Sequence, residues 1–190
     1  LGLAIENRAV QGDLAGALFG AQTGNDKIQV LLTQIAEQIP THAVIFDVST
    51  DRGIRHGNQT LTEIMYRLFL ESLGYARDLD LSELEIALAA DGRLAEFEET
   101  FERVHDKKWD ERKGLVAFAM SEASAAMHEL SPHVYEDKDS WADAAKGKAD
   151  ITPGKLAERV ALLTERRKPG HNVLFVVDEV GQFVARDVQK

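Results

Sequence analysis

The pattern of apolar positions predicts a chain of amphipathic helices interrupted by two short strands. Residues 28–39 repeat apolar side chains at the 3.6-residue period of a helix, with Asn25 or Asp26 as N-cap and Pro40 as the stop. Residues 1–20 also have helix-like composition, although Gly12, Gly16 and Gly20 lower their helix propensity, so we expect a weaker helix there.

The two predicted strands are short apolar runs rich in β-branched side chains: residues 43–48, with Asp47 near the end, and the continuous run 173–177. Such runs are typical of strands buried on both faces of a parallel sheet. A helix over 60–73 opens with a Thr60–Glu63 capping box, and a helix from Thr152 precedes the second strand. Since long crossovers connect parallel neighbours, the two strands should pair in parallel.

Residues 75–150 contain no strand-like run. Their apolar spacing predicts helices at about 94–104, 115–130 and 139–146, and an earlier one opened by a Ser82–Glu85 capping box. We therefore predict three parts: residues 1–74 as the first part of an α/β core, 75–150 as an all-helical insertion, and 151–190 as the return to the core.

Acidic residues stand at the ends of both predicted strands. Asp178 and Glu179 follow the second strand directly, and Asp47 lies near the end of the first. Open α/β sheets bind ligands at the carboxyl ends of their strands, and Mg²⁺ prefers oxygen ligands. In P-loop nucleotide hydrolases this is the Walker B position, where the first acid helps to hold Mg²⁺ and the second activates water. An ordinary core strand whose acidic residue caps the helix that follows is the simpler alternative.

The phosphate-binding loop of such enzymes, G-x-x-x-x-G-K-[S/T], is missing from the 190 residues. The two Gly-Lys pairs, Gly147-Lys148 and Gly154-Lys155, lack both the first glycine and the following Ser or Thr. We therefore expect the chain to be a piece of a larger protein, running from after Walker A through Walker B.

Charge and composition exclude several other classes of protein. The net charge of −10 argues against a nucleic-acid surface on this segment, and the absence of cysteine excludes disulfides and thiolate metal sites. No apolar run approaches the length of a membrane span, and the chain shows no signal segment. We expect a soluble, cytoplasmic protein without a membrane partner.

Residues 173–183, Val-Leu-Phe-Val-Val-Asp-Glu-Val-Gly-Gln-Phe, resemble the Walker B segment of the large P-loop ATPases of bacteriophage-exclusion (BREX) systems, the BrxC/PglY family. Residues 151–160 resemble the helix before that segment. The strand at 43–49 and the following Leu-Gly-Tyr at 73–75 are similar to the second core strand of the wider AAA+/origin-recognition-like class. The resemblance covers about half of the chain.

The resemblance implies a P-loop ATPase that uses ATP and Mg²⁺ within an antiphage defence complex. It implies that Glu179 is catalytic, that Asp178 holds Mg²⁺ through water, and that Gln182 contacts nucleotide or a neighbouring subunit. Asp47 is a further candidate Mg²⁺ ligand. It also implies other defence proteins as partners, an oligomer, and DNA contact through the complex rather than through this acidic segment. The piece alone should be inactive.

Two alternatives stay open. In the first, the chain is a non-catalytic interaction module whose acidic helical segment docks a partner protein, in particular through Glu96, Glu98, Glu99 and Glu102. In the second, residues 47–51 form the nucleophile loop of a haloacid-dehalogenase-like phosphatase. That loop needs an acid at the place of Ser49.

Overall fold

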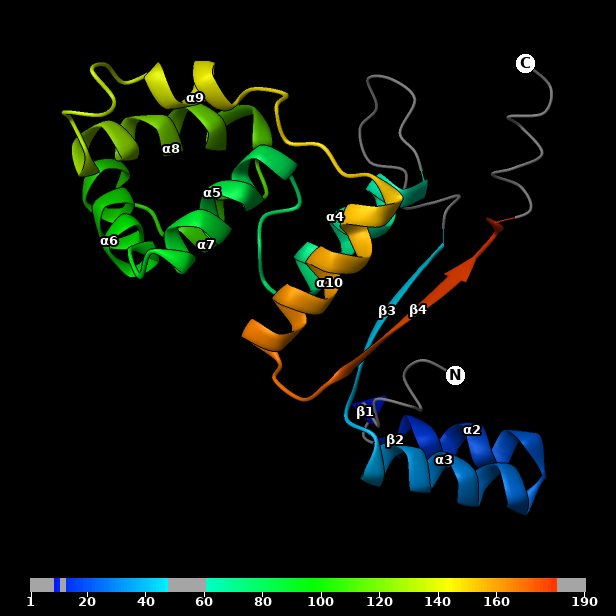
Figure 1. Ribbon diagram of the computed structural model, residues 1–190. Coiled ribbons are helices and arrows are strands. Elements are labelled where there is room, and N and C mark those ends of the chain that lie inside the picture. Colours follow the sequence, from blue (N-terminus) through cyan, green and yellow to red (C-terminus); the bar gives the residue numbers. More distant parts are fainter. Residues whose placement is uncertain (1–8, 11–12, 48–60, 181–190) are drawn as a thin grey trace. The chain divides into compact units, whose positions relative to one another are not determined.

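The chain folds into a helix-rich α/β protein with a small parallel sheet. The computed structural model describes residues 9–10, 13–47 and 61–180 (Figure 1). In chain order the described elements are β1 (Ala9–Val10), β2 (Asp13–Leu14), α2 (Ala15–Thr23), α3 (Asp26–Gln38), β3 (Thr41–Asp47), α4 (Leu61–Ser72), α5 (Leu79–Ala90), α6 (Leu94–His105), α7 (Trp109–Arg112), α8 (Val116–Leu130), α9 (Ser140–Ala145), α10 (Pro153–Arg167) and β4 (Asn172–Asp178).

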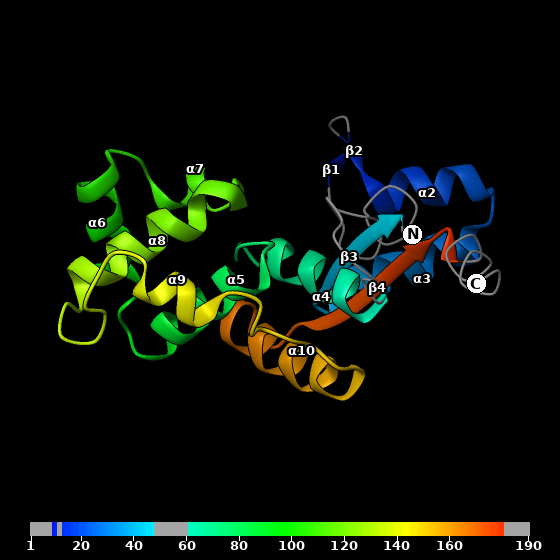
Figure 2. The same cartoon turned by 90° about the horizontal axis from the view of Figure 1, so that it is seen from above.

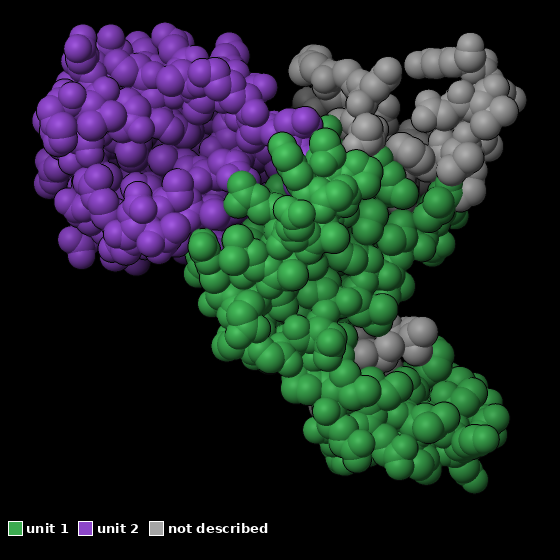
Figure 3. Space-filling model, viewed as in Figure 1, with its two compact units in different colours: residues 1–69, 152–190 green, residues 70–151 purple. Residues whose placement is uncertain are grey.

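Two compact units divide the chain (Figure 3). Unit 1 comprises residues 1–69 and 152–190, and unit 2 comprises residues 70–151. One boundary falls within α4 and the other just before α10. The described part of unit 2 is helical throughout. Its interpretation as an insertion into a nucleotide-hydrolase core stays a prediction.

The described residues of unit 1 form a parallel sheet of β3 and β4, which run side by side in the same direction (Figures 1 and 2). Their register pairs Thr41 with Asn172 and ends with Asp47 opposite Asp178. The predicted parallel pairing is thereby confirmed. The crossover between the two strands includes all of unit 2 and α10.

One face of this sheet is better covered than the other. Phe69 of α4 lies on Phe175 of β4, with 6.1 Å between their ring centroids. By strand alternation the opposite face carries Ile45 and its partner Val176, and Ile45 is 44% exposed. The prediction that both strands are buried on both faces is therefore wrong for β4, whose side chains are only half-buried. Among the described residues β4 has one strand neighbour, so its other edge is not covered by a strand.

The N-terminal part of unit 1 corrects one expectation and confirms another. Strands β1 (Ala9–Val10) and β2 (Asp13–Leu14) form a short antiparallel pair, and helix α2 begins at Ala15. A glycine inside a helix costs about 1 kcal/mol relative to alanine, so a long helix over 1–20 gains little from propensity. In α3 the Asn25 side chain caps Lys27 and Ile28 as predicted, but Leu31 of the predicted inner face is 47% exposed.

The helices beside the sheet agree with the sequence pattern. In α10 the Thr152 hydroxyl caps the first turn by accepting from the Lys155 amide, followed by Pro153 at the first helical position. In α4 the predicted inward residues Ile64 and Phe69 are buried. The predicted Thr60 cap and the loop at 49–58 lie outside the described residues.

The core of unit 2 is an aromatic cluster where α6, α7 and α8 meet. The Phe97 and Phe101 rings are fully buried, and each meets Trp109 edge-on at 5.3 and 5.0 Å between centroids. Small residues of α8, among them Ala119 and Ala123, let the helices approach closely, and Trp141 of α9 completes the cluster. The predicted helices α6, α8 and α9 are confirmed, whereas α7 is an additional helix.

The predicted Ser82–Glu85 capping box is wrong. Helix α5 begins earlier, at Leu79, where the Asp78 carboxylate caps the amides of Asp80 and Leu81. Aspartate is as strong an N-cap as serine, and in α5 Asp78 occupies the N-cap position. Ser82 instead donates its hydroxyl to the Leu79 carbonyl inside the helix.

Glu85 does not cap a helix. It is a buried carboxylate that contacts three segments of unit 2. It is 2% exposed and accepts hydrogen bonds from the Ala76 amide (2.5 Å) and the Trp109 indole (2.8 Å). Lys113 lies 3.4 Å away and also donates to the Gly74 carbonyl. Burial raises the pKa of Glu85 above its ordinary value of 4.5, against the opposing effect of these donors.

This raised pKa gives unit 2 a pH-dependent stability. The folded state holds the Glu85 proton more tightly than the unfolded state, so this contribution is complete below about pH 4.5 and is lost as pH rises through the folded pKa. Glu85→Gln removes the ionisable group, so it should not lose stability as pH rises above 4.5. The difference between the free energies of unfolding of the variant and the wild type should therefore change with pH above this value. Urea unfolding followed by tryptophan fluorescence measures it, because both tryptophans, Trp109 and Trp141, lie in unit 2.

Glu129→Gln, on the exposed side of α8, is the matched control. It should leave the pH profile of the wild type unchanged. If Glu85→Gln and Glu129→Gln give parallel profiles between pH 4.5 and 8, the raised pKa of Glu85 is contradicted.

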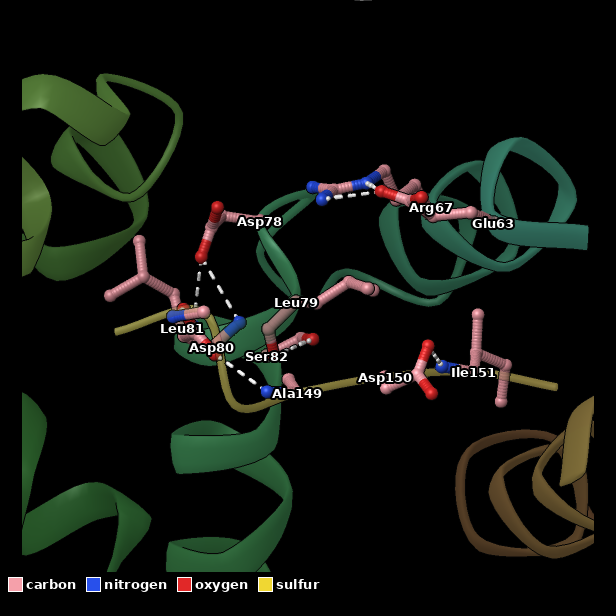
Figure 4. A network of polar contacts seen from close by, with 11 residues as sticks. Glu63, Arg67, Asp78, Leu79, Asp80, Leu81, Ser82, Ala149, Asp150 and Ile151 are labelled. Atoms are coloured by element: carbon pink, nitrogen blue, oxygen red, sulfur yellow. Dashed lines mark hydrogen bonds and ion pairs between the residues drawn. The ribbon is translucent and has the colours of Figure 1, made fainter. Parts of the chain in front are cut away.

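Asp80 holds the two ends of unit 2 together (Figure 4). Its carboxylate accepts hydrogen bonds from the amides of Gly147 (2.7 Å) and Ala149 (2.9 Å), sixty-seven and sixty-nine residues further along the chain. Gly147 has φ of +67°, a left-handed conformation that glycine adopts without strain. The contact therefore fixes the segment after α9 against the start of α5.

Asp80→Ala should lower the free energy of unfolding of unit 2 by about 1–3 kcal/mol, because two amide donors lose a charged acceptor. Tryptophan fluorescence in urea measures the change. Asp143→Ala, an exposed acid on α9, should cost far less. Equal losses for the two variants would show that the two amide contacts contribute nothing specific.

Candidate functional site

The candidate site is the carboxyl end of the parallel sheet, where three predicted acids meet. Asp47 ends β3 and Asp178 ends β4, and the two are direct partners in the strand register. Partners on adjacent strands point to the same face, here the face of Ile45 and Val176 rather than the face covered by Phe69. The structure thus brings two carboxylates to one edge and one face of the sheet.

Glu179 follows in an unusual backbone conformation. Its φ is +58°, in the left-handed region that residues other than glycine and asparagine seldom adopt. Its amide donates a hydrogen bond of 2.8 Å to the Asp178 carboxylate. The positive φ turns the chain sharply at the end of β4, and the side chain of Glu179 is half-buried while that of Asp178 is exposed.

The donor set at this edge matches the hard oxygen ligands that Mg²⁺ takes. Mg²⁺ in nucleotide sites uses one or two carboxylates and completes its shell with water and phosphate oxygens. Asp178 and Asp47 supply two carboxylates on adjacent strands. In the described part of the chain, no group of three or more His, Cys, Asp or Glu side chains is arranged to hold a metal by itself. The two carboxylates at this edge are thus of the type that could contribute to a Mg²⁺ site.

Two further predictions cannot be located. Gln182, expected to contact nucleotide, lies outside the described residues, and so does the phosphatase-like loop after Asp47 with Ser49 and Asp51.

Comparison with known proteins leaves the chain without an assigned family. No protein-family model matches it, and no solved structure matches it. Within the described residues, no helix has the length and apolar character that a membrane crossing needs.

The acidic face of α6, the proposed docking surface of the alternative hypothesis, is arranged largely as a solvated helix surface. Glu96, Glu99 and Glu102 are exposed, and Glu98 is half-buried. Glu96 pairs with Arg93 at 3.0 Å one turn earlier. This pattern requires no partner.

The group formed by Glu85, Trp109 and Lys113 is a polar cluster in the interior that was not predicted from the sequence. One signal was present, because Glu85 stands between Leu84 and Ile86 in a helix with apolar residues on all sides. A charged residue in such a helix needs partners when it is buried. The left-handed backbone of Glu179 had no signal, because nothing in the residue type predicts it.

Proposed function

We propose that this chain is part of an ATP-hydrolysing P-loop ATPase and contributes its Walker B acids, Asp178 and Glu179. One observation supports this most: two parallel strands end in register at Asp47 and Asp178, and Glu179 follows at once in a left-handed conformation. Strained backbone of this kind costs of order 1–3 kcal/mol and is concentrated at functional sites.

In this proposal each acid has its own role. Asp178, exposed at the end of β4, would help to hold Mg²⁺, and its strand partner Asp47 would be a second carboxylate for the ion. Glu179 accepts a proton from the water that attacks the terminal phosphate. A bound Mg²⁺ would supply charge neutralisation at the phosphate oxygens.

The wider biological role rests on the family resemblance alone. We propose a cytoplasmic component of a BREX antiphage complex, working with other defence proteins, as an oligomer, and with DNA reached through the complex. The net charge of −10 is consistent with the absence of a nucleic-acid surface on this segment.

Nucleotide binding tests the proposal on the chain itself. Without a phosphate-binding loop, the 190-residue chain should bind Mg-ATP no more tightly than about 1 mM, an affinity worth only about 4 kcal/mol. A longer protein that carries the loop should bind in the micromolar range. Isothermal titration of both proteins measures the difference. Micromolar binding by the 190-residue chain alone would contradict the division of the site that we propose.

A further inference from the structure

A run of apolar residues at the start of α8 is exposed to solvent. Leu115, Val116 and Phe118 are 51%, 41% and 59% exposed, and Ala117 between them is exposed as well. Four consecutive exposed apolar residues are uncommon on a surface without a binding role. By comparison, Val134, the other strongly exposed apolar residue of unit 2, has polar or charged neighbours on most sides in the sequence.

Positively charged side chains lie next to this run. The Arg112 guanidinium sits 5.5 Å from the centre of the Phe118 ring and also donates from Nε to Glu122, at 2.8 Å. His105 and Lys107 lie near the same carboxylate. The hydrogen bond from Arg112 lowers the pKa of Glu122, and the charges of Arg112, His105 and Lys107 lower it further.

The charge balance of this corner is opposite to that of the whole chain. Glu122 forms an ion pair with Arg112, and the charge of Lys107 acts on the same carboxylate, whereas the chain as a whole carries a net charge of −10. Residues 103–113 hold five of the 22 lysines and arginines and only three acids. Lys107 is exposed, so its charge is available to a partner.

We propose that the exposed run Leu115–Phe118 and its neighbours Arg112 and Lys107, together the α8 corner, bind an acidic amphipathic segment of another protein. Apolar side chains of the segment would cover Phe118 and Leu115, and its carboxylates would face the cations. An exposed aromatic ring beside an arginine is the composition of an interface centre. This surface differs from the acidic face of α6, and the proposal does not depend on ATP hydrolysis.

A synthetic probe tests the α8 corner in the 190-residue protein. The probe is a fluorescein-labelled helical peptide of about sixteen residues with Leu and Phe on one face and Glu on the other; a second peptide carries Lys in place of each Glu. Fluorescence anisotropy should show tighter binding of the acidic peptide, weakened by salt. Phe118→Ser and Lys107→Glu should each weaken it at least about tenfold. Val134→Ser, with an equally exposed side chain outside the corner, should not.

Several results would overturn the proposal. These are equal binding of the two peptides, binding of the acidic peptide that Phe118→Ser leaves unchanged, or no binding of the acidic peptide. Two other results would overturn it in favour of a different occupant. If the protein binds phosphatidylserine vesicles and Phe118→Ser abolishes this binding, the α8 corner binds a membrane. If the protein dimerises with rising concentration and Phe118→Ser abolishes dimerisation, the α8 corner binds a second copy of the chain. Because Phe118 and Lys107 are exposed, the variants should keep the wild-type melting curve.

Discussion

Replacement of Glu179 by glutamine is expected to slow ATP hydrolysis by the longer ATPase by roughly 10²–10⁴-fold, the range typical of losing a general base. Glutamine keeps the size of the side chain but cannot accept a proton from water. The substitution leaves Asp178 in place, so nucleotide affinity should change little. Steady-state kinetics should therefore show a reduced kcat with a KM close to that of the wild type.

The matched control is Glu158→Gln, an exposed glutamate on α10 in the same unit. It should leave kcat within a factor of two or so of the wild type, since surface substitutions rarely change stability or chemistry. An unchanged kcat for Glu179→Gln would make the acidic pair structural. The interaction-module hypothesis would then be favoured over the ATPase.

Truncation of Phe101 to alanine is expected to destabilise unit 2 by about 3–5 kcal/mol, the usual cost of deleting a buried phenylalanine. Its ring is fully buried and contacts both Trp109 and His105, at 5.0 and 4.6 Å between centroids. A small domain has a total stability of only about 5–15 kcal/mol, so the loss is a large part of it. The midpoint of thermal unfolding, followed by tryptophan fluorescence, should fall by more than about 10 °C.

Phe118→Ala is the control for this prediction, because it removes the same atoms from a position that is 59% exposed. Its cost should stay within about 1 kcal/mol, including the lost contact with Arg112. If the two variants unfold at the same temperature, the aromatic cluster does not form the core of unit 2.

The sequence predicted best those elements whose signals are local. Asn25 before α3 and Thr152-Pro153 before α10 are caps that act within one turn, and both are confirmed. The β3–β4 pairing was also predictable, since two apolar runs separated by helices have a restricted set of arrangements.

The wrong predictions have two causes: two residues can compete for one N-cap position, and some contacts join residues that are distant in the sequence. Both Asp78 and Ser82 can start α5; Asp78 takes the N-cap position, while Glu85, expected to complete the Ser82 cap, accepts a hydrogen bond from the Trp109 indole twenty-four residues away. Burial of β4 was overestimated, because an apolar run carries no information on how many neighbours will cover it. At the candidate site the acids were predicted, but the left-handed conformation of Glu179 was not, because its residue type carries no signal for it.

The central claim, that Glu179 acts on the chemical step, is tested most directly by a single-turnover measurement. The longer protein, wild type or Glu179→Gln, is mixed in excess with labelled ATP and Mg²⁺, and samples are quenched in acid at successive times. Under these conditions slow product release does not affect the measured rate of ATP conversion. Our account predicts that the wild type converts its bound ATP to ADP, whereas the variant binds the same ATP and converts it at least about a hundredfold more slowly. Conversion at the same rate in both proteins would contradict it.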